Sequence, residues 1–114
     1  MAPLIMAIPV LPEKVEQARQ FFGEKAGPRS GELDAVNRRN GLTAEVWQLQ
    51  DTPQGPLLLG YVEVPNLARF LHDYATMTGA FERWEKQQFK EITGVDFNEP
   101  ATGPLPETLF DWRA

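Results

Sequence analysis

Residues 43–64 read TAEVWQLQDTPQGPLLLGYVEV, and this stretch decides the fold. Two β-rich runs, Thr43–Gln50 and Leu57–Val64, flank a segment with the proline and glycine that are typical of a hairpin turn. A turn at Thr52–Gly55 sets the register of the two strands, because each residue before the turn then faces one residue after it. The sequence therefore predicts an antiparallel hairpin.

Side chains alternate between the two faces of such a hairpin. Trp47 is expected opposite Gly60, so that the indole covers backbone that glycine leaves bare. One face is predicted to carry Glu45, Trp47, Leu49, Leu58, Gly60, Val62 and Val64. The other face is predicted to carry Val46, Gln48, Gln50, Leu57, Leu59, Tyr61 and Glu63. Neither face is polar enough to meet water alone.

The flanking sequence predicts one more strand and four helical segments. The apolar run 4–10 is typical of a strand. A helix is expected up to Gly27, and a shorter one is expected from Ser30 to Gly41. Asn66 is a predicted helix cap before a stripe of Leu67, Phe70, Leu71 and Tyr74. The last helix is expected between Gly79 and Gly94, with Phe81, Trp84, Phe89 and Ile92 facing inward and Glu82 and Lys86 facing solvent.

This order predicts a single α+β domain over residues 1–114. The pattern is βαββα with an optional final strand, which is the ferredoxin-like motif with an antiparallel sheet and helices on one face. An α+β sandwich with the same elements in another strand order is the alternative. The proline-containing tail, residues 95–114, is expected to be extended, with 108–113 as a last edge strand or an arm.

Composition excludes several classes of function. The 114 residues carry a net charge of −5 without a cluster of basic residues, so nucleic-acid binding is not expected. The chain has no cysteine, which excludes disulfides and thiolate metal sites. The apolar run 4–11 is too short for a membrane span and lacks a basic flank, so we expect no membrane association and a cytoplasmic location.

A sheet that is apolar on both faces needs cover on both. Helices of a βαββαβ chain cover one face only, and the same face of a second copy is the simplest cover for the other. We therefore expect a homodimer.

The whole chain resembles the dimeric α+β barrel group of ferredoxin-like proteins. Residues 41–55, GLTAEVWQLQDTPQG, and residues 109–113, LFDWR, are similar to a family of small uncharacterised bacterial proteins within that group. The resemblance implies a homodimer in which two sheets form a barrel. The wider group includes cofactor-free monooxygenases, haem-dependent enzymes and non-enzymatic members, so the resemblance does not select an activity.

Glu45 is the candidate catalytic residue. It shares its predicted face with Trp47 and two leucines, and an acid in an apolar, aromatic-lined cavity has a raised pKa and can serve as a base. The alternative is an ion pair of Glu45 with Arg38, Arg39 or a partner-chain arginine at the rim.

The candidate ligand-binding residues combine apolar and aromatic side chains with one cation: Trp47, Leu49, Leu58, Tyr61 and Arg38. The predicted register places Tyr61 on the face opposite Trp47, so one chain cannot bring both into one cavity. The single histidine, His72, falls on the predicted solvent side of its helix. No Asp, Glu or His cluster has ligand spacing, so we expect neither a metal nor a cofactor.

Three functions remain open. The first is a homodimeric module that binds a small apolar or aromatic molecule. The second is a cofactor-free enzyme of the monooxygenase or isomerase kind. The third is a structural domain for protein–protein interaction.

Overall fold

The computed structural model describes residues 2–99 and 103–114, and it has an antiparallel sheet of three strands. The strands are β1 (Ala2–Pro9), β2 (Ala44–Thr52) and β3 (Gly55–Val64), in the spatial order β1-β3-β2. Four helices connect or follow them: α1 (Val15–Ala26), α2 (Ser30–Arg39), α3 (Leu67–Thr76) and α4 (Ala80–Thr93). The predicted α+β class is confirmed.

The hairpin register is confirmed residue by residue. Thr52 pairs with Gly55, Trp47 with Gly60 and Glu45 with Val62. β1 completes the sheet by pairing antiparallel with the other side of β3. β2 is therefore an edge strand, and this position explains why Trp47 is only partly buried.

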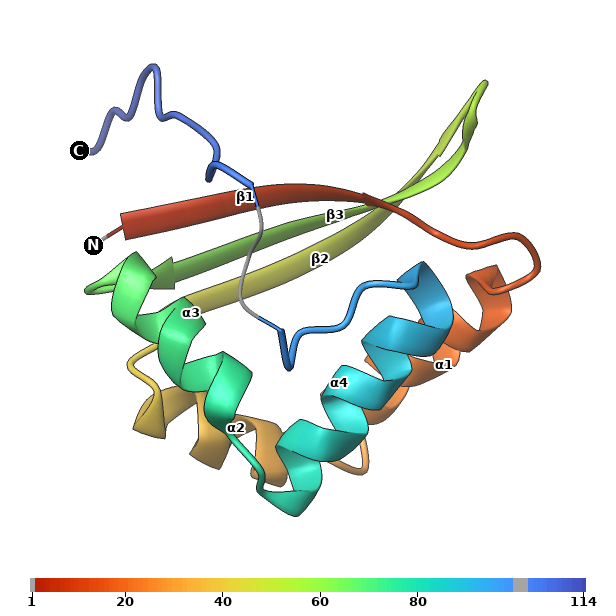
Figure 1. The fold of residues 1–114 in the computed structure, drawn as a ribbon, viewed down its shortest axis with the longest axis horizontal. Helices are drawn as coiled ribbons and strands as arrows, with labels where there is room; N and C mark the ends of the chain where they lie inside the picture. Colours follow the sequence, from red (N-terminus) through yellow and green to blue (C-terminus); the bar gives the residue numbers. More distant parts are fainter. Residues whose placement is uncertain (1, 100–102) are drawn as a thin grey trace.

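All four helices lie on one face of the sheet (Figure 1). Two helix ends are set by local signals that the sequence predicts. The Asn66 side chain accepts a hydrogen bond from the backbone N–H of Arg69 at the start of α3, and Gly94 ends α4 in the left-handed conformation that glycine adopts without strain. The covered face and the helices enclose a core that contains Val10, Ala18, Phe21, Leu58, Phe89 and Ile92.

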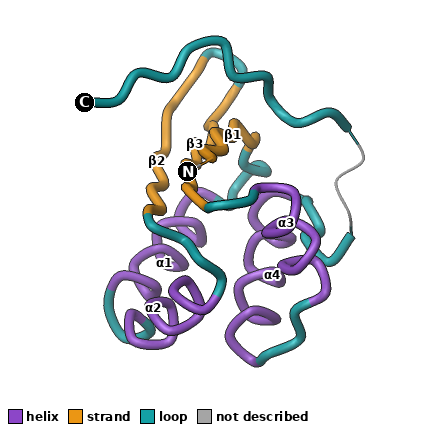
Figure 2. Tube along the Cα trace, turned by 90° about the vertical axis from the view of Figure 1, so that its left-hand side faces the viewer, coloured by secondary structure: helices purple, strands orange, loops and turns teal. Residues whose placement is uncertain are grey.

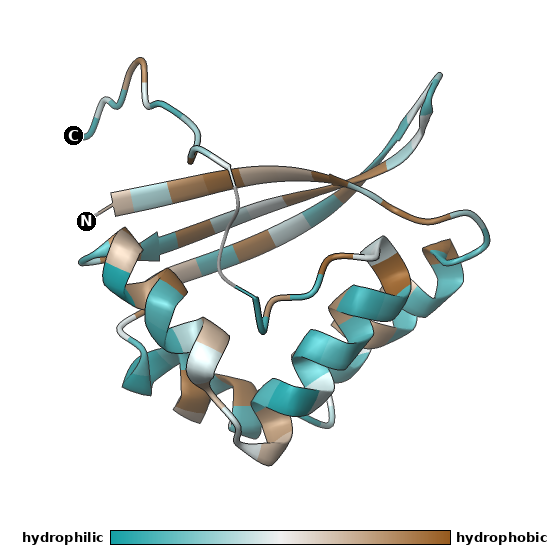
Figure 3. Cartoon of the chain, in the orientation of Figure 1, coloured by the Kyte–Doolittle hydropathy of each residue, from teal (hydrophilic) through white to brown (hydrophobic). Residues whose placement is uncertain are grey.

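The opposite face of the sheet carries the end of the chain. Residues 103–114 run over this face, so the strands lie between the helices and the tail (Figure 2). The described tail contains no strand, so residues 108–113 do not form the optional final strand. Part of the tail lies outside the described residues. Apolar residues occur along the strands and again within the tail (Figure 3).

Two charged residues of α4 are not where the sequence placed them. We expected Glu82 and Lys86 on the solvent side, but both are buried. The Lys86 ammonium donates to the backbone oxygens of Met77 at 2.9 Å and Ala75 at 3.4 Å, at the end of α3. The helical period predicted one buried stripe that faces the sheet. In the structure, the end of α3 also packs against α4, so a wider part of its surface is buried.

Candidate functional site

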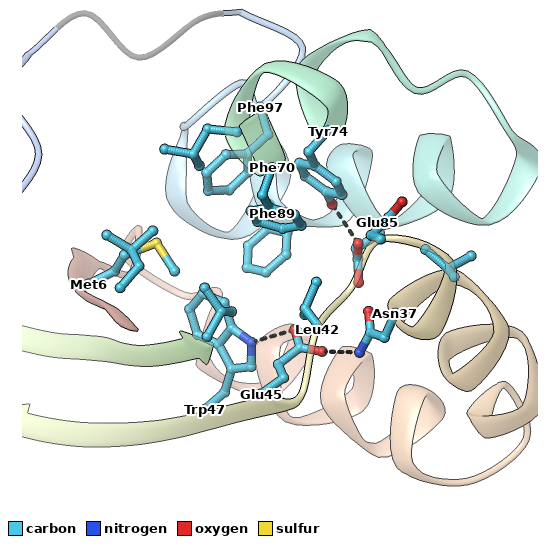
Figure 4. Close-up of a pocket in the computed structure, with 15 residues that line it drawn as sticks. Met6, Asn37, Leu42, Glu45, Trp47, Phe70, Tyr74, Glu85, Phe89 and Phe97 are labelled. Atoms are coloured by element: carbon cyan, nitrogen blue, oxygen red, sulfur yellow. Dashed lines mark hydrogen bonds between the residues drawn. The ribbon is translucent and has the colours of Figure 1, made fainter. Parts of the chain in front are cut away.

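A cavity of about 60 Å³ lies between the covered face of the sheet and the helices. Most of its wall is apolar or aromatic, including Trp47, Phe70, Phe89 and Phe97 (Figure 4). Since roughly 10–15 Å³ holds one water molecule, the space accommodates several waters or one small organic group.

Polar groups gather at one end of this cavity. The side chains of Glu45 from β2, Glu85 from α4, Asn37 from α2 and Tyr74 from α3 all lie there (Figure 4). Four elements thus place two carboxylates, one amide and one phenol around a small volume, and Asn40, directly after α2, adds a second amide to the cavity lining.

Lys25 joins the two carboxylates from behind the cavity wall. Its Nζ lies 2.7 Å from Oε2 of Glu85 and 3.4 Å from Oε2 of Glu45, and its side chain is 4% exposed. The ammonium also lies 5.1 to 5.7 Å from the ring centres of Phe21, Phe22 and Phe89. A buried cation is stable only with such partners, because its loss of hydration is otherwise uncompensated.

Glu45 is held as an ionised carboxylate. Burial on its own raises the pKa of Glu45, but the Lys25 ammonium and the hydrogen bonds from Trp47 and Asn37 outweigh burial, so the pKa lies below the ordinary 4.5. Trp47 Nε1 donates to Oε2 at 2.9 Å, and Asn37 Nδ2 donates to Oε1 at 2.9 Å. The expectation of a raised pKa for Glu45 is wrong, because donors surround this carboxylate.

Tyr74 is held as a neutral phenol. Its hydroxyl donates to Oε1 of Glu85 at 2.5 Å. Burial, together with the charge and hydrogen bond of Glu85, raises the pKa of Tyr74 well above its ordinary 10.0. The phenol therefore keeps its proton at neutral pH and serves as a hydrogen-bond donor.

Of the candidate residues from the sequence, the structure brings Glu45 and Trp47 together at the cavity. The pairing partner of Glu45 differs from our expectation: it is Lys25, and neither Arg38 nor Arg39 bonds to it. The ion pair is thus inside the domain rather than at a rim, because α1 and α4 close over this end of β2.

The other candidates lie elsewhere. Leu58 belongs to the core, and Leu49 packs against that core without lining the cavity. Tyr61 lies on the opposite face of the sheet, as its register requires, and its hydroxyl donates to Glu63. Arg38 is exposed and pairs with Asp34 one turn earlier on α2, at 2.9 Å.

Sequence reasoning missed Lys25, Asn37 and Glu85, and it placed Tyr74 on the inward stripe of its helix. Lys25 and Glu85 carried one usable signal, since each stands at helical spacing from an inward aromatic: Lys25 four residues after Phe21 and Glu85 four residues before Phe89. Asn37 carried no comparable signal beyond following Val36.

In the described part of the chain, no group of three or more His, Asp or Glu side chains is arranged to hold a metal ion. His72 is exposed on α3 beside Asp73, as predicted.

None of the helices in residues 2–99 and 103–114 is long and apolar enough to cross a lipid bilayer.

Comparison of the chain with models of known protein families, with curated proteins and with solved structures found no match.

Proposed function

We propose that this protein is a homodimeric module that binds a small apolar or aromatic molecule. The observation that carries the proposal is the cavity beneath the sheet, which combines aromatic walls with a few polar groups at one end. Small-molecule sites generally have this composition: apolar walls give affinity, and a few placed polar groups fix orientation.

The cavity has a cost when it is empty. Protein interiors are packed about as densely as organic crystals, and cavities destabilise the folded state by about 24 cal/mol per Å³. At about 60 Å³, this cavity costs roughly 1.5 kcal/mol. A ligand that fills it recovers contacts with the aromatic walls, so binding raises the stability of the folded protein.

A wider hollow of about 370 Å³ adjoins the cavity. Met6, Tyr74 and Phe97 line both spaces. Phe97 packs against Phe89, with ring centres 5.1 Å apart, and comes from the segment after α4 rather than from a helix. A ligand thus has a route into the cavity past Phe97 that leaves the sheet and the helices in place.

Thermal unfolding with a panel of small aromatic metabolites, quinones and organic acids tests the binding proposal. We expect at least one compound class to raise the melting temperature. Leu42→Phe adds volume to the cavity wall and should remove that shift, whereas Leu11→Phe makes the same change at an exposed loop and should retain it. An equal shift in both variants would place the binding elsewhere.

The second copy is proposed to cover the tail-bearing face of the sheet. Ile5 and Val46 are exposed on this face. In the tail, Leu109, Phe110 and Trp112 are 87%, 85% and 75% exposed. Large contiguous apolar patches of this kind are uncommon on monomers and mark interaction surfaces.

The total surface area supports a second copy as the partner. A compact monomer of 12.9 kDa has an accessible surface of roughly 6,300 Å² by the usual size scaling. This chain exposes 7529 Å², which is about 1,200 Å² more. A stable dimer buries about 600–1,000 Å² on each partner, so the excess suffices for one such interface.

Ferredoxin-like topology and a dimeric barrel are part of this proposal. The order β1-β3-β2 and the one-sided helices support it. Light scattering at micromolar concentration should give about twice the chain mass. Ile5→Asp should shift the protein to monomer, while Leu11→Asp, the same change at an exposed residue on the other side, should leave the dimer intact. A monomeric wild-type protein would refute the proposed dimer.

The enzyme hypothesis is weaker on this geometry. Glu45 has the position of a base beside a cavity, but Lys25, Trp47 and Asn37 stabilise its charged form and so lower its affinity for a proton. The structural-domain hypothesis predicts a dimer whose melting temperature is not raised by any of the compounds. The ligand panel and the light-scattering measurement therefore separate the binding module from the structural domain.

A further inference from the structure

The polar end of the cavity has hydrogen-bond acceptors to spare and few donors. Trp47 and Tyr74 each have a single side-chain donor, and both already donate to a carboxylate. Asn37 and Lys25 direct hydrogens to the same two carboxylates. Asn40 also lines the cavity, and its Nδ2 donates to Sδ of Met77 at 3.4 Å. An ionised carboxylate offers about four lone-pair sites. Among the described residues, Glu45 uses three of these and Glu85 uses two.

The charged side chains that line the cavity are both carboxylates. Glu45 and Glu85 line it, and Lys25 behind them is the cation that bonds to both. A second buried cation, Lys86 of α4, bonds to backbone oxygens at the end of α3 and interacts electrostatically with Glu82 and more weakly with Glu85. Among the described residues that line the cavity itself there are thus two carboxylates and no cation.

Lys25 shows what kind of group this environment holds. Its ammonium lies against the two carboxylates on one side and the faces of three phenylalanine rings on the other. The same two carboxylates line the cavity, and its walls are again aromatic, with Phe70, Phe89 and Trp47. Cations are attracted to aromatic faces, and the attraction grows when water is excluded.

We propose that the ligand of the cavity is a small organic amine in its protonated form, with the ammonium against Glu45 and Glu85 and the apolar part among the aromatic side chains. This inference rests on the proposed binding function and names its ligand class. An anionic ligand would face two carboxylates, and a neutral one would bring no cation to a wall whose charged side chains are both carboxylates. The net charge of the whole chain, −5, further favours the approach of a cation.

Matched probes of one shape and different charge test the ligand class. Benzylamine, benzyl alcohol and benzoate share a ring and differ in the polar group, and isobutylamine with isobutanol gives a smaller pair. Calorimetric titration of the wild-type protein at pH 7 should show the amine of each pair binding at least tenfold more tightly than the alcohol. Benzoate should bind more weakly than either benzyl compound.

The charge of one carboxylate is then removed at constant shape. Glu45→Gln should bring benzylamine and benzyl alcohol to within threefold of each other, whereas Glu16→Gln, the same change at an exposed site on α1, should leave the tenfold preference. If Glu45→Gln does not fold, the titrations of the wild-type protein with the matched probes test the ligand class on their own.

The outcomes separate the two proposals. Equal or tighter binding of the alcohol or of benzoate overturns the amine inference and leaves the binding function in place. Tenfold amine preference that persists in Glu45→Gln overturns the assigned position of the ammonium. If neither these probes nor the wider panel of apolar compounds binds, the binding function falls together with the inference.

Discussion

Replacing Gly60 with alanine places a methyl group in steric overlap with the indole ring of Trp47. A Cβ built on Gly60 lies 2.4 Å from Cζ3 and 2.6 Å from Cη2 of the indole, well inside van der Waals contact. The backbone does not oppose the change, because Gly60 is not among the residues with positive φ. The substitution therefore tests the packing of this one cross-strand pair.

The indole cannot move aside without losing ring contacts and a hydrogen bond. Its ring centre lies 5.5 Å from that of Phe22 and 5.2 Å from that of Phe89, and its Nε1 is bonded to Glu45. Overpacking of a core site costs about 1–3 kcal/mol, and a lost hydrogen bond to a charged group costs about 1.5–3 kcal/mol. Because the ring is at a sheet edge and relaxes in part, we expect Gly60→Ala to cost about 3 kcal/mol.

A double-mutant cycle isolates the pair. Trp47→Ala alone should cost about 3 kcal/mol, the lower end of the range for emptying an aromatic site, since the ring is only partly buried. In that background Gly60→Ala should be neutral or stabilising by about 0.5 kcal/mol, because the obstacle is gone and alanine restricts the unfolded chain. The coupling is then about 3 kcal/mol.

Urea unfolding followed by far-ultraviolet circular dichroism measures all four proteins at one protein concentration, since the loss of a tryptophan does not disturb this signal. Additive effects, with a coupling below about 0.5 kcal/mol, would show that Trp47 does not cover Gly60. The hairpin register and the placement of the cavity wall would then both be wrong.

Three further predictions concern ionisable groups. Lys25→Met should lower the free energy of unfolding by about 3–5 kcal/mol in urea, because it leaves Glu45 and Glu85 buried without their cation; a cost below about 1 kcal/mol would contradict the charged cluster. The lowered pKa of Glu45 contributes stability that is complete above the ordinary value of 4.5 and is lost as pH falls through the folded pKa. The stability difference between wild type and Glu45→Gln should accordingly shrink below pH 4.5, and a difference that grows there would refute the sign. His72→Ala should change stability by less than about 0.5 kcal/mol at pH 7, as for an exposed residue, and a larger loss in the same urea assay would mean that His72 has a partner.

The sequence alone determined the local structure. The alternation of residues 43–64 and the turn at Thr52–Gly55 predicted every pair of the hairpin, because a shift by one residue exchanges the two faces. Asn66 and Gly94 marked helix ends because a side-chain acceptor and a left-handed glycine satisfy backbone groups within a few residues. These interactions are short in sequence, so the residue pattern contains them.

Only the tertiary structure decided which polar residues are buried and what they contact. Lys25, Glu45 and Glu85 come from α1, β2 and α4, and their ion pairs join residues that are 20 and 60 positions apart. The pattern could assign Glu82 and Lys86 to solvent because it sees one helix at a time, whereas their burial depends on the helices packed beside α4. The same reason explains the reversed pKa shift of Glu45. The face of the strand followed from the register, but the sign of the shift followed from Lys25 of α1 and Asn37 of α2, together with Trp47 of the same strand.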